Sequence, residues 1–89
     1  MFKVIDGNDT GKTRKLLMEC SDHNGLFVCN HPEGVREKCA AYNINPIPES
    51  IGYNDLIYYE GRKPVYVDEL EKLITYILPN VEGYTLTKD

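Results

Sequence analysis

The N-terminal part of the chain indicates the fold, because residues 2–20, FKVIDGNDTGKTRKLLMEC, contain three patterns in succession. Phe2 to Ile5 is a short apolar run with β-branched residues, which predicts a buried strand. Residues 6–11, DGNDTG, are small and polar and include two glycines, which predicts a loop. From Lys12 to Cys20 the apolar side chains share one helical face, so a helix should follow the loop. A strand, a loop and an amphipathic helix in this order are typical of an α/β fold.

The rest of the chain continues this alternation. Further strands are expected at Leu26–Cys29, Val65–Val67 and 83–87, and further helices at about residues 33–42 and 70–77. The stretch INPIPESIGYND, residues 44–55, is predicted to be mostly loop, with a brief strand at residues 50–53. We therefore expect a single domain over residues 1–89, built as three α/β/α layers around a small, mostly parallel sheet of about four strands. The expected strand order places Val65–Val67 beside Leu26–Cys29, followed by 83–87 and then 2–5.

The composition indicates a globular protein that acts in the cytoplasm. Hydrophobic residues make up 42% of the chain and charged residues 27%, which is typical of a folded soluble domain. No apolar run reaches the ~20 residues of a membrane span, and the first residues contain no signal-peptide core, so no membrane association is expected. The net charge of −4 disfavours nucleic acid as a partner.

Three cysteines, Cys20, Cys29 and Cys39, cannot all pair within one chain, which fits a reducing compartment. Together with His23 and His31 they could suggest a zinc site. Structural zinc sites usually contain two tight ligand pairs, however, whereas Cys29 and Cys39 here occupy apolar strand and helix positions. The sequence therefore predicts buried thiols.

The loop Asp6–Thr13, DGNDTGKT, resembles the Walker A loop, G-x-x-x-x-G-K-[ST], of P-loop nucleoside triphosphatases. In that family, backbone N–H groups cradle the phosphates, the lysine reaches the β- and γ-phosphates, and the Ser/Thr hydroxyl binds Mg²⁺. The resemblance implies a nucleotide site formed by Gly7, Asn8, Asp9, Thr10, Gly11, Lys12, Thr13 and Arg14. Two alignments stay open: either Asp6 replaces the first glycine, or the loop is one residue short.

A second motif, residues 64–69 or PVYVDE, resembles the Walker B strand of the branch that has an additional catalytic glutamate, the AAA, RecA and helicase-like group. This resemblance implies that Asp68 holds Mg²⁺ together with Thr13, and that Glu69 polarises the attacking water. Lys12 and Glu69 would then be the catalytic residues, and Thr87 the polar residue that senses the γ-phosphate. The implied activity is Mg²⁺-dependent binding and slow hydrolysis of ATP or GTP, by a minimal core of the size that small phage genes encode.

Other interpretations use the same residues differently. DGNDTGKT could be a solvated turn with a helix cap, and Asp68-Glu69 could simply begin a helix. Asp6 to Gly11 also matches the start of a calcium loop, but the acid due at its twelfth position falls on Leu17. Finally, the chain could be a non-catalytic protein-interaction module that keeps a P-loop scaffold and uses residues 46–64 to bind a host protein, or that forms a homo-oligomer.

Overall fold

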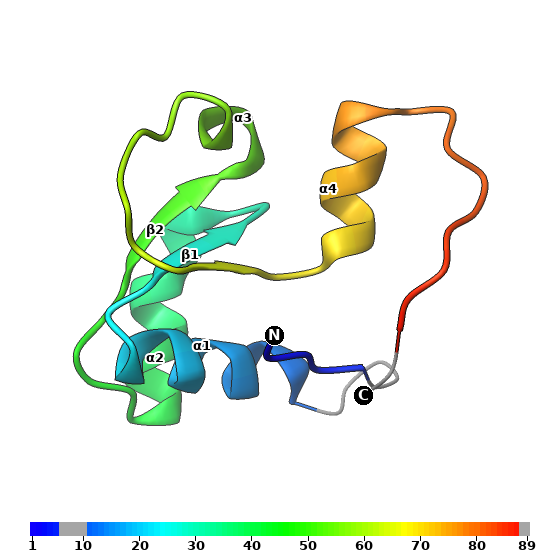
Figure 1. Cartoon of the computed structure of the whole chain (residues 1–89). Coiled ribbons are helices and arrows are strands. Elements are labelled where there is room, and N and C mark those ends of the chain that lie inside the picture. The colour runs from blue at the N-terminus through cyan, green and yellow to red at the C-terminus, as the bar shows by residue number, and fades with distance from the viewer. Residues whose placement is uncertain (6–10, 88–89) are drawn as a thin grey trace.

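The computed structural model describes residues 1–5 and 11–87, and these form a small mixed α/β domain (Figure 1). Its sheet has three parallel strands in the order β2-β1-β3: β1 (Leu26–Cys29), β2 (Glu49–Gly52) and β3 (Val65–Val67). In the register of the sheet, Val28 of β1 lies between Ile51 of β2 and Val67 of β3. All four residues of β1 are buried, because a central parallel strand is covered on both faces.

The described residues also form four α-helices and one short 3₁₀ turn. α1 (Lys12–Asp22) precedes β1, η1 (Pro32–Gly34) and α2 (Val35–Tyr42) connect β1 to β2, α3 (Tyr53–Leu56) connects β2 to β3, and α4 (Leu70–Ile77) follows β3. The helices cover both faces of the sheet. Successive side chains of a strand point to opposite faces, so alternate residues of β1 contact different helices. Phe27 and Cys29 pack with residues of α1 and α2, whereas Leu26 and Val28 pack with Tyr53 of α3 and Leu73 of α4. The sheet therefore lies between two layers of helices.

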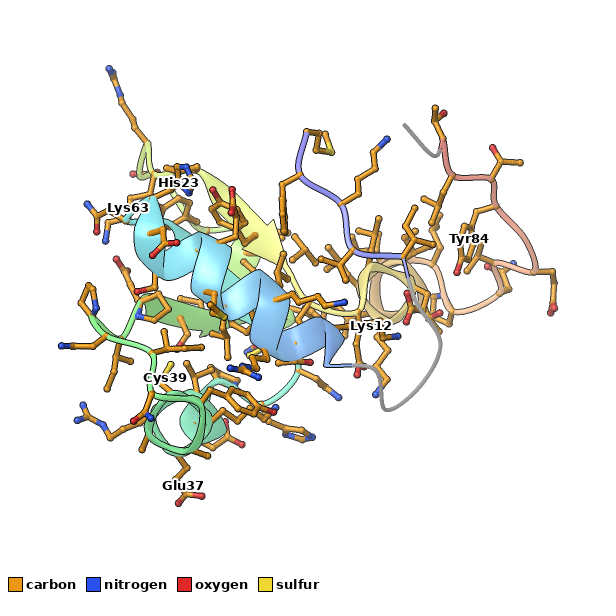
Figure 2. The ribbon with its side chains drawn as sticks, turned by 90° about the horizontal axis from the view of Figure 1, so that it is seen from below. Lys12, His23, Glu37, Cys39, Lys63 and Tyr84 are labelled. Atoms are coloured by element: carbon orange, nitrogen blue, oxygen red, sulfur yellow. The ribbon has the colours of Figure 1, made fainter. Side chains whose placement is uncertain are left out.

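The three cysteines belong to the core, as predicted. Cys20, Cys29 and Cys39 are buried and free. Figure 2 shows Cys39 on the side of α2 that faces α1, while Glu37 points away from it. None of the helices in the described part of the chain combines the length and the apolar character that crossing a membrane requires.

Two of the predicted strands, Leu26–Cys29 and Val65–Val67, are confirmed, and they are neighbours as expected. The brief strand predicted at residues 50–53 is present one residue earlier, at Glu49–Gly52, and it lies on the other side of β1.

The prediction of strands at residues 2–5 and 83–87 is wrong, because both segments have an irregular backbone. Phe2, Ile5, Tyr84 and Leu86 are 46–55% exposed. A strand is stable only when its backbone groups pair with a neighbour, and neither segment has a place in the sheet of the described residues. The segment after α4 instead returns as a long arm to the N-terminal segment, where Lys3 Nζ donates a hydrogen bond to the Thr87 carbonyl at 2.6 Å (Figure 1).

Candidate functional site

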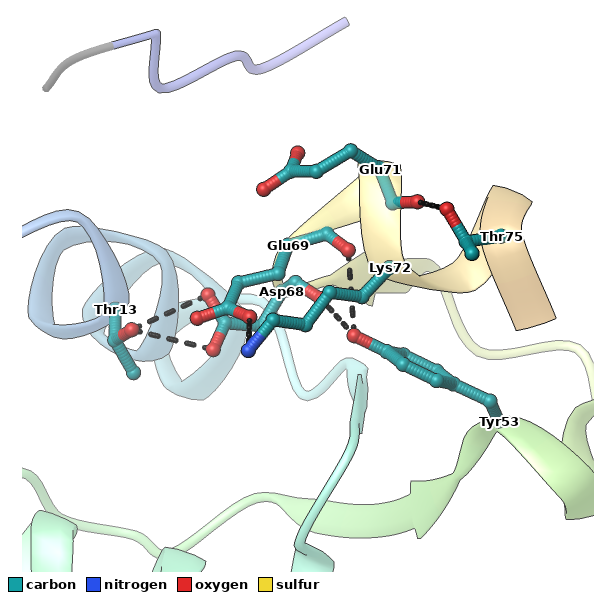
Figure 3. Close-up of polar contacts among 7 residues, drawn as sticks. All are labelled: Thr13, Tyr53, Asp68, Glu69, Glu71, Lys72 and Thr75. Carbon is teal, nitrogen blue, oxygen red and sulfur yellow. Dashed lines mark hydrogen bonds and ion pairs between the residues drawn. The ribbon is translucent and has the colours of Figure 1, made fainter. Parts of the chain in front are cut away.

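The carboxyl end of β3 lies beside the N-terminal turn of α1, and one side-chain contact joins them. The Thr13 Oγ1 hydroxyl donates to the Asp68 carboxylate and lies 3.2 Å from both Oδ1 and Oδ2 (Figure 3). These residues are 55 positions apart in the sequence. Asp68 is only 9% exposed, and its backbone N–H donates to the Val28 carbonyl at 2.8 Å, which continues the sheet one residue beyond β3. One residue of each sequence motif, Thr13 and Asp68, therefore meet at the carboxyl end of β3.

The start of α1 has a concentration of positive charge. Its N-cap, Gly11, has φ 78°, a left-handed conformation that glycine adopts without steric cost, and its carbonyl accepts from Lys15 N–H at 3.1 Å. The first turn contains no acidic residue, although helices favour acids at this end. Lys12, Arg14 and Lys15 occupy it instead, and Figure 2 shows Lys12 at the beginning of the helix. Cations at the positive end of a helix dipole disfavour the isolated helix but favour a bound anion.

The surroundings of the Asp68 carboxylate disfavour its charged form. Burial raises the pKa of Asp68 above its ordinary value of 3.8, and the neighbouring carboxylate of Glu69 adds to this increase. The hydrogen bond from Thr13 and the ammonium groups of Lys38 and Lys12 lower this pKa and so oppose the shift. A buried carboxylate of this kind is stabilised by a nearby cation.

Glu69 has an unusual backbone at the junction of β3 and α4. Its φ of 56° and ψ of 65° are left-handed, a conformation that is unfavourable for a residue with a Cβ atom. Its carboxylate lies 2.6 Å from Lys72 Nζ, one turn along α4 (Figure 3). Glu69 occupies the N-cap position without a side-chain cap hydrogen bond. Glu69 thus begins α4, as the alternative interpretation of Asp68-Glu69 expects, although its side chain pairs with Lys72 and does not cap the helix.

Tyr53 is a component of the site that sequence reasoning missed. Its hydroxyl donates to the Asp68 carbonyl at 2.7 Å and lies 3.3 Å from the Glu69 carbonyl (Figure 3). The side chain is buried, and burial together with the surrounding acids raises the pKa of the Tyr53 hydroxyl well above its usual range. The sequence marks Tyr53 only as an aromatic residue after Gly52, at the end of a brief strand, and no motif connects it with Asp68.

The remaining predicted site residues are not part of the contact between Thr13 and Asp68. Gly7, Asn8, Asp9 and Thr10, together with Asp6, lie outside the described residues. Arg14 is exposed on α1. Thr87 lies on an irregular segment, so the strand end expected to carry a γ-phosphate sensor is not formed there.

His31 is exposed, and its Nδ1 lies 3.4 Å from the Glu33 carboxylate. A shallow pocket of about 380 Å³ lies against α4, and neither Asp68 nor Glu69 lines it. It is lined by Asn30, Tyr53, Glu71, Lys72, Thr75 and Tyr76.

Among residues 1–5 and 11–87, no group of three or more His, Cys, Asp or Glu side chains could by itself hold a metal ion. Thr13 and Asp68 nevertheless provide two oxygen donors that are already in contact, and Mg²⁺ usually takes only one or two protein ligands alongside phosphate oxygens and water. The two oxygens are of the type that Mg²⁺ binds in proteins.

Comparison with known protein families, curated proteins and solved structures gave no match.

Proposed function

We propose that this chain binds ATP or GTP with Mg²⁺ and slowly hydrolyses the β–γ phosphoanhydride bond. The contact between the Thr13 hydroxyl and the Asp68 carboxylate carries the proposal. The resemblance to P-loop nucleoside triphosphatases assigns both residues to the magnesium ion, although they are 55 positions apart. Their direct contact is the arrangement that a shared magnesium site requires.

The start of α1 supports phosphate binding independently of that contact. Backbone N–H groups of the first turn have no partners within the helix, and Gly11 bends the chain without a side chain in the way. Lys12 adds a charge that can reach the β- and γ-phosphates. We assign the phosphates to residues 7–14, with Lys12 providing the principal charge.

In the proposed hydrolysis, Mg²⁺ would neutralise the charge that develops on the β- and γ-phosphate oxygens. Glu69 would take a proton from the attacking water, the water oxygen would bond to the γ-phosphorus, and the β–γ bridging oxygen would leave on the nucleoside diphosphate. Lys12 would hold the γ-phosphate in line with that water. Because no arginine finger is recognisable in the sequence, we expect turnover by the isolated chain to be slow.

The proposed fold is a truncated P-loop-type domain with a small parallel sheet. The three parallel strands, with helices on both faces, support this assignment. The order of β1 and β3 also agrees with it. Neither residues 2–5 nor residues 83–87 form the expected fourth strand, so the proposal rests on the three strands of the described residues.

Calorimetry provides the direct test. We expect the parent chain to bind Mg-ATP or Mg-GTP, and the affinity to fall when EDTA removes the metal. Thr13→Ala should lower the Mg²⁺-dependent affinity by at least about 10-fold, because it removes a hydrogen-bonding group from a charged site. Thr75→Ala is a matched control, since the Thr75 hydroxyl bonds to the Glu71 carbonyl within α4. Absence of binding at millimolar nucleotide would contradict the proposal.

One observation favours a second candidate, a protein-interaction module that retains the scaffold. Ile57 and Tyr58, in the proline- and tyrosine-rich stretch 46–64, are 75% and 77% exposed. Exposed apolar side chains next to each other are typical of contact surfaces. A host protein or a second copy of the chain would be the partner. In that case Ile57→Ser together with Tyr58→Ser should abolish partner binding, and Lys12→Ala should not affect it.

A further inference from the structure

The acidic pair is attached to the fold from two opposite directions. On one side, the Asp68 carboxylate accepts from Thr13 on α1. On the other, the Asp68 carbonyl accepts from Tyr53, the first residue of α3. Tyr53 follows β2, and β1 separates β2 from β3 in the sheet. The Tyr53 hydroxyl therefore links the end of one outer strand to the end of the other.

The backbone at Asp68 and Glu69 also has to be held in its unfavourable conformation. Glu69 has left-handed dihedral angles, which a residue with a Cβ atom keeps only where its surroundings hold it. The Tyr53 hydroxyl lies within hydrogen-bonding distance of the carbonyls on both sides of the turn, 2.7 Å from that of Asp68 and 3.3 Å from that of Glu69. Tyr53 itself is fixed, because its ring is 5% exposed and packs in one core cluster with Leu26, Val28 and Leu73.

We propose that Tyr53 is the positioning residue of the acidic pair. Its hydroxyl fixes the Asp68–Glu69 peptide, and thereby aims the Asp68 carboxylate at Thr13 and holds Glu69 at the start of α4. This inference rests on the proposed function. Tyr53 acts through Asp68 and Glu69 and makes no contact of its own with the nucleotide.

The proposal separates two contributions to nucleotide affinity. Lys12 and the N-terminal turn of α1 bind phosphate without Asp68, so binding in EDTA should not depend on Tyr53. The additional affinity that Mg²⁺ provides requires Thr13 and Asp68 to be aligned, so it should depend on Tyr53. The ratio of the Kd in EDTA to the Kd in Mg²⁺ measures this contribution without any need for turnover.

The test compares Tyr53→Phe with Tyr76→Phe. Tyr76 is a suitable control, because its ring lies 6.3 Å from that of Tyr53 and is 56% exposed. In calorimetry with ATP, Tyr53→Phe should lower the ratio at least about fivefold while changing the Kd in EDTA less than twofold. Tyr76→Phe should leave both quantities unchanged. A ratio in Tyr53→Phe equal to that of the parent would overturn the proposal.

Thermal unfolding shows whether each variant is folded. If the single variant Tyr53→Phe does not fold, the same substitution is made in the Glu69→Gly chain. This chain has an unstrained turn at position 69, because glycine adopts the left-handed conformation without strain. A loss smaller than fivefold is expected between Glu69→Gly and the double variant, because the glycine turn needs less restraint while the Asp68 carbonyl still loses its donor. An equal ratio in the two would again overturn the assignment. If the parent shows no Mg²⁺-dependent binding, the proposed function and this inference fail together. If the parent binds and Tyr53→Phe matches it, only the inference fails.

Discussion

Two regions of the molecule differ in how far they bury similar side chains. One is the central unit, residues 11–77, and the other comprises the two terminal segments, residues 1–5 and 79–87. Phe27 in the central unit is 1% exposed, whereas Phe2 in the N-terminal segment is 46% exposed. Both lie in short apolar runs with β-branched or aromatic neighbours. Phe27 belongs to a strand that is paired on both sides, and Phe2 belongs to an irregular segment. An apolar run therefore becomes a buried strand only where a neighbouring strand pairs with its backbone.

The largest effect expected from this comparison is on stability. Phe27→Ala should lower the free energy of unfolding by about 3–5 kcal/mol, because it removes a fully buried aromatic side chain and leaves a cavity. Phe2→Ala should cost less than about 1 kcal/mol, since that side chain is already half exposed. Urea denaturation of both variants measures the difference. Equal losses would show that the N-terminal segment packs as tightly as the sheet.

Glu69→Gln is expected to have the next largest effect. The amide keeps the size of the side chain but cannot accept the proton of the attacking water, so turnover should fall by roughly 10²-fold or more while nucleotide binding stays nearly intact. Glu71→Gln, in the first turn of α4, is the control and should change turnover less than about twofold. Phosphate release measures both. Normal turnover in Glu69→Gln would leave Glu69 with no part in the chemistry.

Much of the central unit was predictable because local patterns determine it. The uninterrupted apolar run of Leu26–Cys29 indicated a strand covered on both faces, and all four residues are buried. The contact between Thr13 and Asp68 agrees with the expected shared site, but it arises for another reason. No strand precedes α1 in the described residues, and α1 reaches the carboxyl end of β3 because it packs against the sheet. The strand predicted at residues 83–87 failed because local apolar character says nothing about whether a pairing partner exists.

Tyr53 was not predictable for a related reason. Its contact with Asp68 depends on β2 lying on the far side of β1, and that placement is a property of the whole sheet. The left-handed backbone of Glu69 was equally hidden, because no glycine or asparagine marks it. Local sequence thus indicated the contact between Thr13 and Asp68, and tertiary structure determined that Tyr53 joins it.

Burial in the central unit should also appear as a dependence of stability on pH. Loss of hydration raises the pKa of the Cys20 thiol from 9.0 to about 11. The unfolded chain therefore loses this proton before the folded chain does, so folding stability is unaffected below pH 9 and falls as the pH rises toward 11. The loss should be about 2 kcal/mol by pH 11, as an order of magnitude. Urea denaturation at several pH values should show a shallower decline for Cys20→Ala, and equal declines would contradict the burial of the thiol.

Within the site, Lys12→Ala should weaken binding of Mg-ATP by at least about 30-fold, because it removes the charge assigned to the β- and γ-phosphates. Lys15→Ala removes the same charge from an exposed position on α1, and should change the affinity by less than about threefold. Calorimetry distinguishes the two. Equal effects would mean that the N-terminal turn attracts nucleotides only through its overall charge.

The smallest expected effect is at Thr87, where the comparison between the two regions bears directly on function. The resemblance to P-loop enzymes assigns a γ-phosphate sensor to this residue, but such a residue acts from a strand end that adjoins the bound phosphate. Thr87 instead lies on an exposed, irregular segment, whose carbonyl accepts from Lys3. Thr87→Ala should therefore change both nucleotide affinity and turnover by less than about twofold, in contrast to Lys12→Ala. A loss of turnover of 10-fold or more, with affinity retained, would instead show that the C-terminal segment closes over the site when nucleotide binds. In that case the segment would contribute to catalysis.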